Sequence, residues 1–117
     1  MRIAYPMAII YEVNLKIAQT IAQEYLSWLY EHINEMLALE GFINAHLYEE
    51  VERLGEKGDA SYIVQYKVAS LSALQHYLEH VAPKMRQEGV NRFAGQFSVT
   101  RRILKLLPDG VFNGTKA

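Results

Sequence analysis

The sequence places a histidine on the apolar face of an expected helix. Within the stretch YLSWLYEHINEML (25–37), His32 falls on the same side as Trp28 and Met36, because each residue turns an α-helix by about 100°. An imidazole in such a position can exchange a proton near neutral pH or anchor a ligand. His32 is therefore the candidate catalytic residue.

Four aromatic residues could line a pocket with His32. Tyr11, Tyr62 and Tyr66 lie on expected strands whose side chains face this helix. Trp28 lies one helical turn before His32. Because aromatic side chains can clasp a flat molecule, these four residues are the candidate ligand-binding set. The more common alternative is a neutral histidine bonded to a tyrosine hydroxyl or a backbone carbonyl inside a closed core.

The other histidines form no metal-binding motif. Only His76 and His80 are four residues apart, and they should point outward from a helix without a nearby Asp or Cys. His46 belongs to a sheet face that we expect to form an interface. The chain has no cysteine, and it lacks a GxSxG motif and a glycine-rich phosphate loop. We therefore predict neither a metal nor a cofactor.

Four arginines gather in the last third of the chain, at positions 86, 92, 101 and 102. Such a group could clamp a carboxylate or phosphate with paired hydrogen bonds. Surface ion pairs with interleaved acids such as Glu88 are the more ordinary alternative.

Hydrophobic patterns predict the elements that position these residues. Apolar residues alternate over four segments that we interpret as strands, at 8–15, 42–53, 61–68 and 97–106. Helical spacing predicts one helix over 18–39, ended by Gly41, and a second that begins after the N-cap Ser70. Pro83 should divide this second helix into two pieces. A turn over 55–59 should join the middle strands.

The order β-α-β-β-α-β predicts an α+β, ferredoxin-like fold, with a four-stranded antiparallel sheet and two helices on one face. The length fits a single domain over residues 7–107, with a flexible leader (1–6) and a flexible tail (108–117). Two helices cover only one face of the sheet. The other face combines apolar residues such as Ile10, Tyr48, Ile63 and Leu104 with polar ones, and we expect it to pair with a second copy as a homodimer.

The composition limits the classes of partner. The formal net charge is −1, so the chain lacks the basic surface of a nucleic-acid-binding protein, and we expect no nucleic-acid partner. No apolar run is long enough for a membrane span, and the N-terminus does not resemble a signal peptide. We expect no membrane association and a cytoplasmic location.

Several segments resemble those of a family of small, uncharacterised bacterial proteins known only as a domain of unknown function. These segments are IIYEVNL, WLYEHI, YIVQYKV, HVAPKMRQEGVNRF and FSVTRRIL, and the likeness spans about residues 7–106. The family is similar to members of the dimeric α+β barrel superfamily, which implies the fold and the dimer. Related branches include cofactor-free monooxygenases, haem-degrading proteins, muconolactone-isomerase-like enzymes and stress-responsive barrels, which place ligands between helices and sheet.

Two functional hypotheses follow. In the first, the protein is a homodimer that binds a small aromatic or apolar molecule between sheet and helices, with proton shuttling by His32 if it is an enzyme of the cofactor-free monooxygenase or isomerase type. In the alternative, it is a structural or protein-interaction module whose core is filled by its own side chains.

Overall fold

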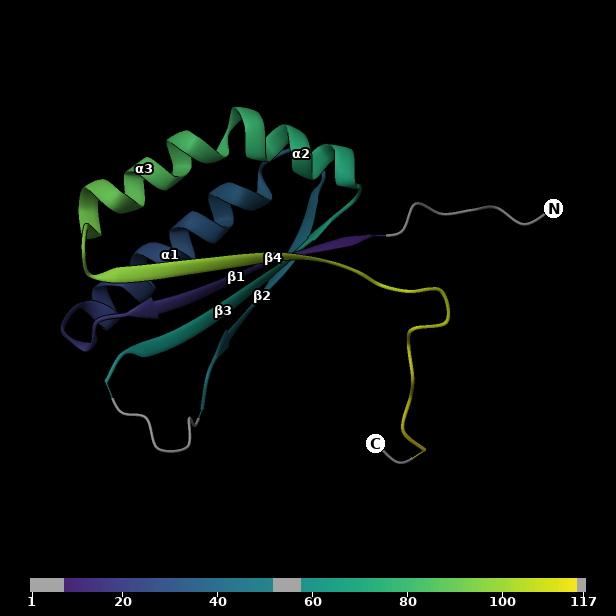
Figure 1. The fold of residues 1–117 in the computed structure, drawn as a ribbon, viewed down its shortest axis with the longest axis horizontal. Coiled ribbons are helices and arrows are strands. Elements are labelled where there is room, and N and C mark those ends of the chain that lie inside the picture. Colours follow the sequence, from purple (N-terminus) through teal and green to yellow (C-terminus); the bar gives the residue numbers. More distant parts are fainter. Residues whose placement is uncertain (1–7, 52–57, 116–117) are drawn as a thin grey trace.

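The computed structural model describes residues 8–51 and 58–115 of the 117-residue chain. Figure 1 shows a single sheet with all helices on one side. In chain order the elements are β1 (Ile9–Ile17), the 3₁₀ turn η1 (Gln19–Ile21), α1 (Ala22–Leu37), β2 (Phe42–Glu49), β3 (Ala60–Val68), α2 (Leu71–His80), α3 (Ala82–Phe93) and β4 (Phe97–Lys105).

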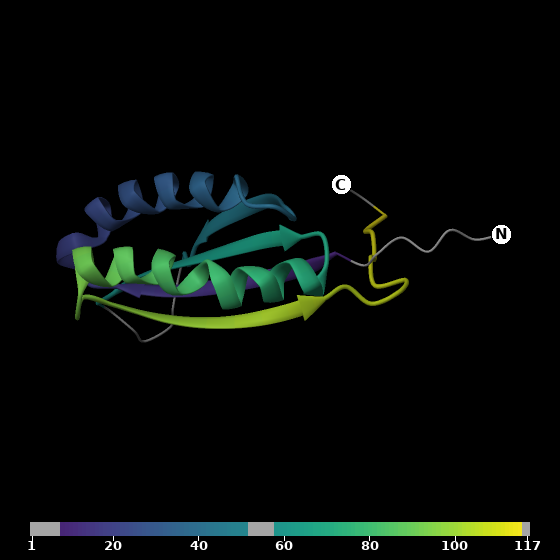
Figure 2. The same ribbon diagram turned by 90° about the horizontal axis from the view of Figure 1, so that it is seen from above.

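The four strands lie in the order β2-β3-β1-β4, and each neighbouring pair is antiparallel. Seen from above in Figure 2, α1 and the α2–α3 pair run along the sheet on the same side. The central strands β1 and β3 supply much of the core through Tyr11, Leu15, Val64 and Tyr66, each at most 3% exposed. The predicted ferredoxin-like α+β fold is confirmed.

Local signals in the sequence set the helix ends. The hydroxyl of Ser70 accepts a hydrogen bond from the backbone N–H of Ala73 at 3.1 Å, as expected of an N-cap. The second helical segment is broken at Val81, and Pro83 lies in the first turn of α3, where its missing N–H costs nothing. The predicted division at Pro83 is confirmed.

Gly41 turns the chain from α1 into β2. Its φ is +87°, a conformation that L side chains rarely adopt. A Cβ at this position would lie 2.6 Å from the Cβ of Ala73. The glycine therefore permits both the turn and the close approach of α2.

A bulge in β2 differs from the sequence prediction. Strict alternation places Ile43 on the helix side with Ala45 and Leu47, but the register shifts between Phe42 and Asn44. As a result Phe42 is buried at 7% exposure, while Ile43 is 53% exposed. The extra residue of a bulge lets one side chain leave the pattern.

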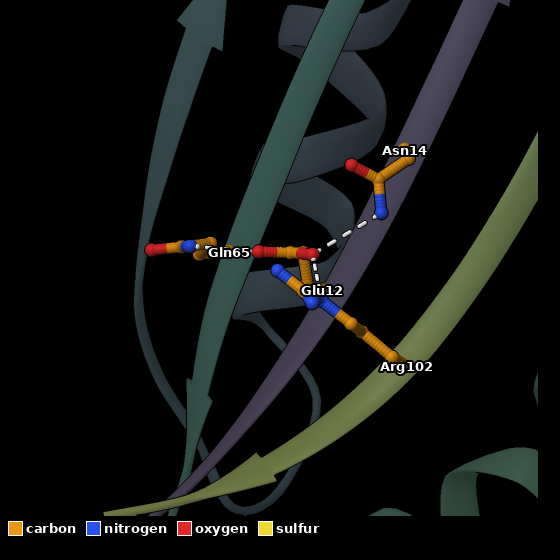
Figure 3. A network of polar contacts seen from close by, with 4 residues as sticks. All are labelled: Glu12, Asn14, Gln65 and Arg102. Atoms are coloured by element: carbon orange, nitrogen blue, oxygen red, sulfur yellow. Dashed lines mark hydrogen bonds and ion pairs between the residues drawn. The ribbon is translucent and has the colours of Figure 1, made fainter.

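On the open face of the sheet, Glu12 is the centre of a polar network (Figure 3). Its carboxylate accepts hydrogen bonds from Gln65 Nε2 at 2.9 Å, from Asn14 Nδ2 at 3.2 Å and from Arg102 Nε, with which it also forms an ion pair. The bond from Arg102 is the main reason that the pKa of Glu12 is lowered to about 2. Burial opposes this shift without overcoming it.

The expected leader, residues 1–6, and most of the predicted turn over 55–59 lie outside the described residues. Residues 106–115 form no helix or strand. Within 8–51 and 58–115, no helix combines the length and the hydropathy that crossing a bilayer requires.

Candidate functional site

A cavity of about 290 Å³ lies between the helices and the sheet. It is lined by side chains from all the long elements except β2. The lining residues are Tyr11, Val13, Leu15, Tyr25, Trp28, Leu29, His32, Met36, Val64, Tyr66, Tyr77, Met85, Arg86, Gly89, Val90, Phe97, Val99 and Arg101. Three of the four candidate ligand-binding residues, together with His32, therefore share one cavity.

His32 contributes an unpartnered polar atom to this cavity. Its Nδ1 is buried and makes no hydrogen bond in the described part of the chain. The ring stacks on that of Trp28, with centroids 4.8 Å apart and planes 14° from parallel. Burial lowers the pKa of His32, and the nearby charge of Glu88 opposes this shift only in part. The imidazole is therefore neutral at pH 7 and can accept a proton.

Three tyrosines form a second part of the wall. The ring centroid of Tyr11 lies 6.1 Å from that of Tyr66 and 6.0 Å from that of Tyr77. Burial raises the pKa of Tyr66 above its ordinary value and that of Tyr77 to about 12. Both hydroxyls therefore keep their protons at neutral pH and can donate hydrogen bonds.

The remaining aromatic wall comes from α1 and the start of β4. Tyr25 lies 5.3 Å from Trp28 and 5.4 Å from Phe97 between ring centroids. Gly89 allows α3 to approach closely, since a Cβ there would lie 3.3 Å from Trp28 Cη2. Trp28 is thus held between Tyr25 on its own helix and the backbone of α3.

Two of the four clustered arginines reach the cavity, Arg86 from α3 and Arg101 from β4. The guanidinium of Arg86 donates to the Tyr11 hydroxyl at 3.3 Å. The other two are engaged elsewhere: Arg92 pairs with Glu24 at 3.5 Å, and Arg102 pairs with Glu12.

Tyr62 does not line this cavity. It is buried at the hairpin end of β3, paired in register with Leu15 and Glu49, and borders a separate hollow with charged residues such as Lys16 and Asp59. Burial, reinforced by the charge of Glu49, raises its pKa. The structure therefore does not bring Tyr62 together with the other candidates.

The other three histidines lie outside the cavity. His46 is exposed on the open sheet face, 6.4 Å from Tyr48 between ring centroids. His76 and His80 are exposed on α2 with their rings 4.7 Å apart. Among the described residues, no three His, Cys, Asp or Glu side chains are grouped so that they could hold a metal ion.

Sequence reasoning missed several cavity residues. Tyr25 was visible as a member of the apolar stripe of α1, and Tyr77 lies between Leu74 and Leu78 on the buried side of α2. Alternation along β4 places Arg101 on the helix side and Arg102 on the open face, but no local pattern distinguished Arg86 from Arg92. Their separation into cavity and surface residues depends on tertiary packing.

The sequence profile of a family described as "Domain of unknown function (DUF4286)" matches residues 8–107, which is most of the chain. The chain belongs to the DUF4286 family. No curated protein matches this member of the family at a significant level. The family assignment gives no activity, but it agrees with the resemblance noted in the sequence.

Solved structures share the fold at low sequence identity. NE2512, a protein of unknown function from Nitrosomonas europaea, has a TM-score of 0.65 at 12% identity, covering 95% of this chain and 100% of that one. SnoaB, a cofactor-independent oxygenase from Streptomyces nogalater, has a TM-score of 0.63 at 12% identity, covering 94% and 99%. A candidate antibiotic biosynthesis monooxygenase from Deinococcus radiodurans has a TM-score of 0.61 at 14% identity, covering 92% and 98%. At such identities the likeness establishes the fold alone.

Proposed function

We propose that this protein binds a small aromatic or apolar molecule in the cavity between sheet and helices. The observation that carries the proposal is the buried, unpartnered Nδ1 of His32 in an aromatic wall. A buried polar atom without a partner costs free energy, and a ligand that bonds to it removes that cost. The volume of about 290 Å³ suits a molecule of one or two rings, because it is near the lower end of small-molecule sites.

The chemistry that we propose is proton transfer by His32, as in a cofactor-free monooxygenase or an isomerase. A neutral imidazole can take a proton from the bound molecule and return it, while the protonated hydroxyls of Tyr66 and Tyr77 donate to the oxygen on which negative charge develops. The fold shared with SnoaB supports this choice by analogy.

A thermal-shift screen over aromatic acids and quinones of one or two rings tests the binding. A molecule that prefers the native state must raise the melting temperature. The matched variant is Val99→Phe, whose larger side chain would extend from β4 into the cavity that Val99 lines. We expect at least one compound to stabilise the parent protein and not this variant. Failure of every compound would contradict the proposal and favour a structural module with a self-filled core.

We propose that two copies pair through the open sheet face. On this face Tyr48 is 49% exposed, and the neighbouring Ile63, its cross-strand partner, is only partly buried. Pairing would remove this apolar surface from water and shield the network around Glu12.

Sedimentation equilibrium should give twice the chain mass. Tyr48→Glu should shift the protein toward the monomer, whereas Tyr30→Glu, at a 59% exposed site on α1, should not. A monomeric parent protein would disprove the pairing.

A further inference from the structure

The four clustered arginines divide into two pairs with different surroundings. Arg102 is held by Glu12 on the open face, as Figure 3 shows, and Arg92 is held by Glu24 on the outer surface of the helices. Arg86 and Arg101 form no ion pair with any described acid. An arginine without an acidic partner at a cavity is available to an anion from solution, because its fork of donors matches a carboxylate.

Both unpaired arginines line the same cavity, one from the helix layer and the other from the sheet. Arg86 reaches it from α3 and touches the Tyr11 hydroxyl, whereas Arg101 reaches it from β4, where its neighbour in register is Val13. Both guanidinium charges act on the hydroxyl of Tyr77 and lower its pKa against the effect of burial. The two charges therefore converge on one region of the site.

None of the residues that line the cavity is acidic, and the nearby Glu88, which acts on His32, lies outside the lining and forms no ion pair with either arginine. Both arginines are exposed, whereas Tyr66 and Leu29 are each 2% exposed. The site thus has an apolar aromatic interior and a cationic opening. A neutral apolar ligand would use only the interior, while a molecule with a ring and one negative group would use both parts.

We propose that the ligand is an aromatic anion, a flat one- or two-ring molecule with a carboxylate or an acidic enol, whose ring lies beside Trp28 and whose negative group pairs with Arg86 and Arg101. This inference rests on the proposed binding function and narrows its ligand class. In this arrangement the arginines select the ligand by charge, and His32 remains free to bond to a second polar atom on the ring system.

Calorimetric titration with two compounds of the same shape tests the charge requirement. The compounds are 2-naphthoate, which is anionic, and 2-naphthamide, which is neutral. The proteins are the parent chain, the double variant Arg86→Gln/Arg101→Gln and the matched control Arg92→Gln, which removes an arginine from outside the cavity. We expect the parent and the control to bind the carboxylate at least about tenfold more tightly than the amide, and the double variant to bind both equally.

Salt dependence provides a second measurement on the parent protein alone, should the double variant not fold. Affinity for 2-naphthoate should fall as ionic strength rises, whereas affinity for 2-naphthamide should stay constant. Equal binding of acid and amide by the parent would overturn the charge requirement and leave the proposed binding function intact. If neither compound binds to the parent protein, both the charge requirement and the proposed binding function are overturned.

Discussion

Replacement of His32 by phenylalanine should stabilise the protein, because the variant loses a buried nitrogen that has no partner. An unsatisfied buried polar group costs about 1–3 kcal/mol. The phenyl ring keeps the stacking on Trp28, and the adjacent cavity accommodates its slightly larger volume. We take the lower end of the range, since the ring is only partly buried, and expect a gain of about 1 kcal/mol at pH 8.

This gain should grow as the pH falls. Burial lowers the pKa of His32 in the folded state, so below about pH 6.5 the unfolded chain binds a proton that the folded chain resists. His32 therefore makes no pH-dependent contribution above that value, and the parent protein loses stability below it. The phenylalanine variant does not undergo this loss, so its advantage in stability should increase as the pH falls below 6.5, by at most about 1.4 kcal/mol per pH unit.

Urea unfolding followed by circular dichroism measures both effects at one fixed protein concentration. At pH 8 the midpoint should rise by roughly 0.5 M urea. His76→Phe, the same change at an exposed site on α2, should alter stability by no more than about 0.5 kcal/mol. A His32→Phe variant that is less stable than the parent at pH 8, or whose advantage shrinks on acidification, would refute the account of His32 as an unpartnered, neutral side chain.

Three further changes test the scaffold. Gly41→Ala should lower the free energy of unfolding by about 2–4 kcal/mol, because the alanine would need a positive φ and its Cβ would lie 2.6 Å from that of Ala73. A loss below about 1 kcal/mol in urea unfolding would contradict this reasoning. Ser70→Ala should cost about 1 kcal/mol through loss of the N-cap bond, whereas Ser70→Asp should keep most of that stability in thermal unfolding. The pKa of Glu12 in the folded state is about 2, so its carboxylate contributes stability above pH 4.5, and this stability is lost as the pH falls toward 2. Acid unfolding of Glu12→Gln should therefore show a smaller loss of stability than that of the parent protein over this pH window.

The fold could be predicted because its signals are local. Alternation over 61–68 matches β3 to within one residue, Ser70 caps α2, and Pro83 marks the start of α3. The predicted strand over 42–53 ends earlier, at Glu49. Periodicity gave no sign of the bulge at Ile43, because a bulge depends on the partner strand and leaves the residue types unchanged.

The site was only partly predictable because it is assembled from six elements. The apolar stripe of α1 was sufficient to identify His32 and Trp28, since both belong to a single helix. Tyr62 lies on the same face of β3 as Tyr66, but it is too far along the strand to reach the cavity. Alternation predicts which face of a strand a side chain occupies and not how far along the strand a cavity extends. The selection of Arg101 over its neighbour Arg102 follows from which face of β4 each side chain occupies.

The proposed binding of an aromatic ligand beside Trp28 can be tested by nuclear magnetic resonance. The chain has one tryptophan, so its indole N–H gives a single cross-peak that reports on the cavity wall. Titration with 2-naphthoate should move this cross-peak progressively to saturation, and it should move little in Val99→Phe, whose larger side chain would occupy part of the cavity. An indole signal that stays fixed while the compound perturbs only amides on the outer surface would contradict a ligand site between sheet and helices.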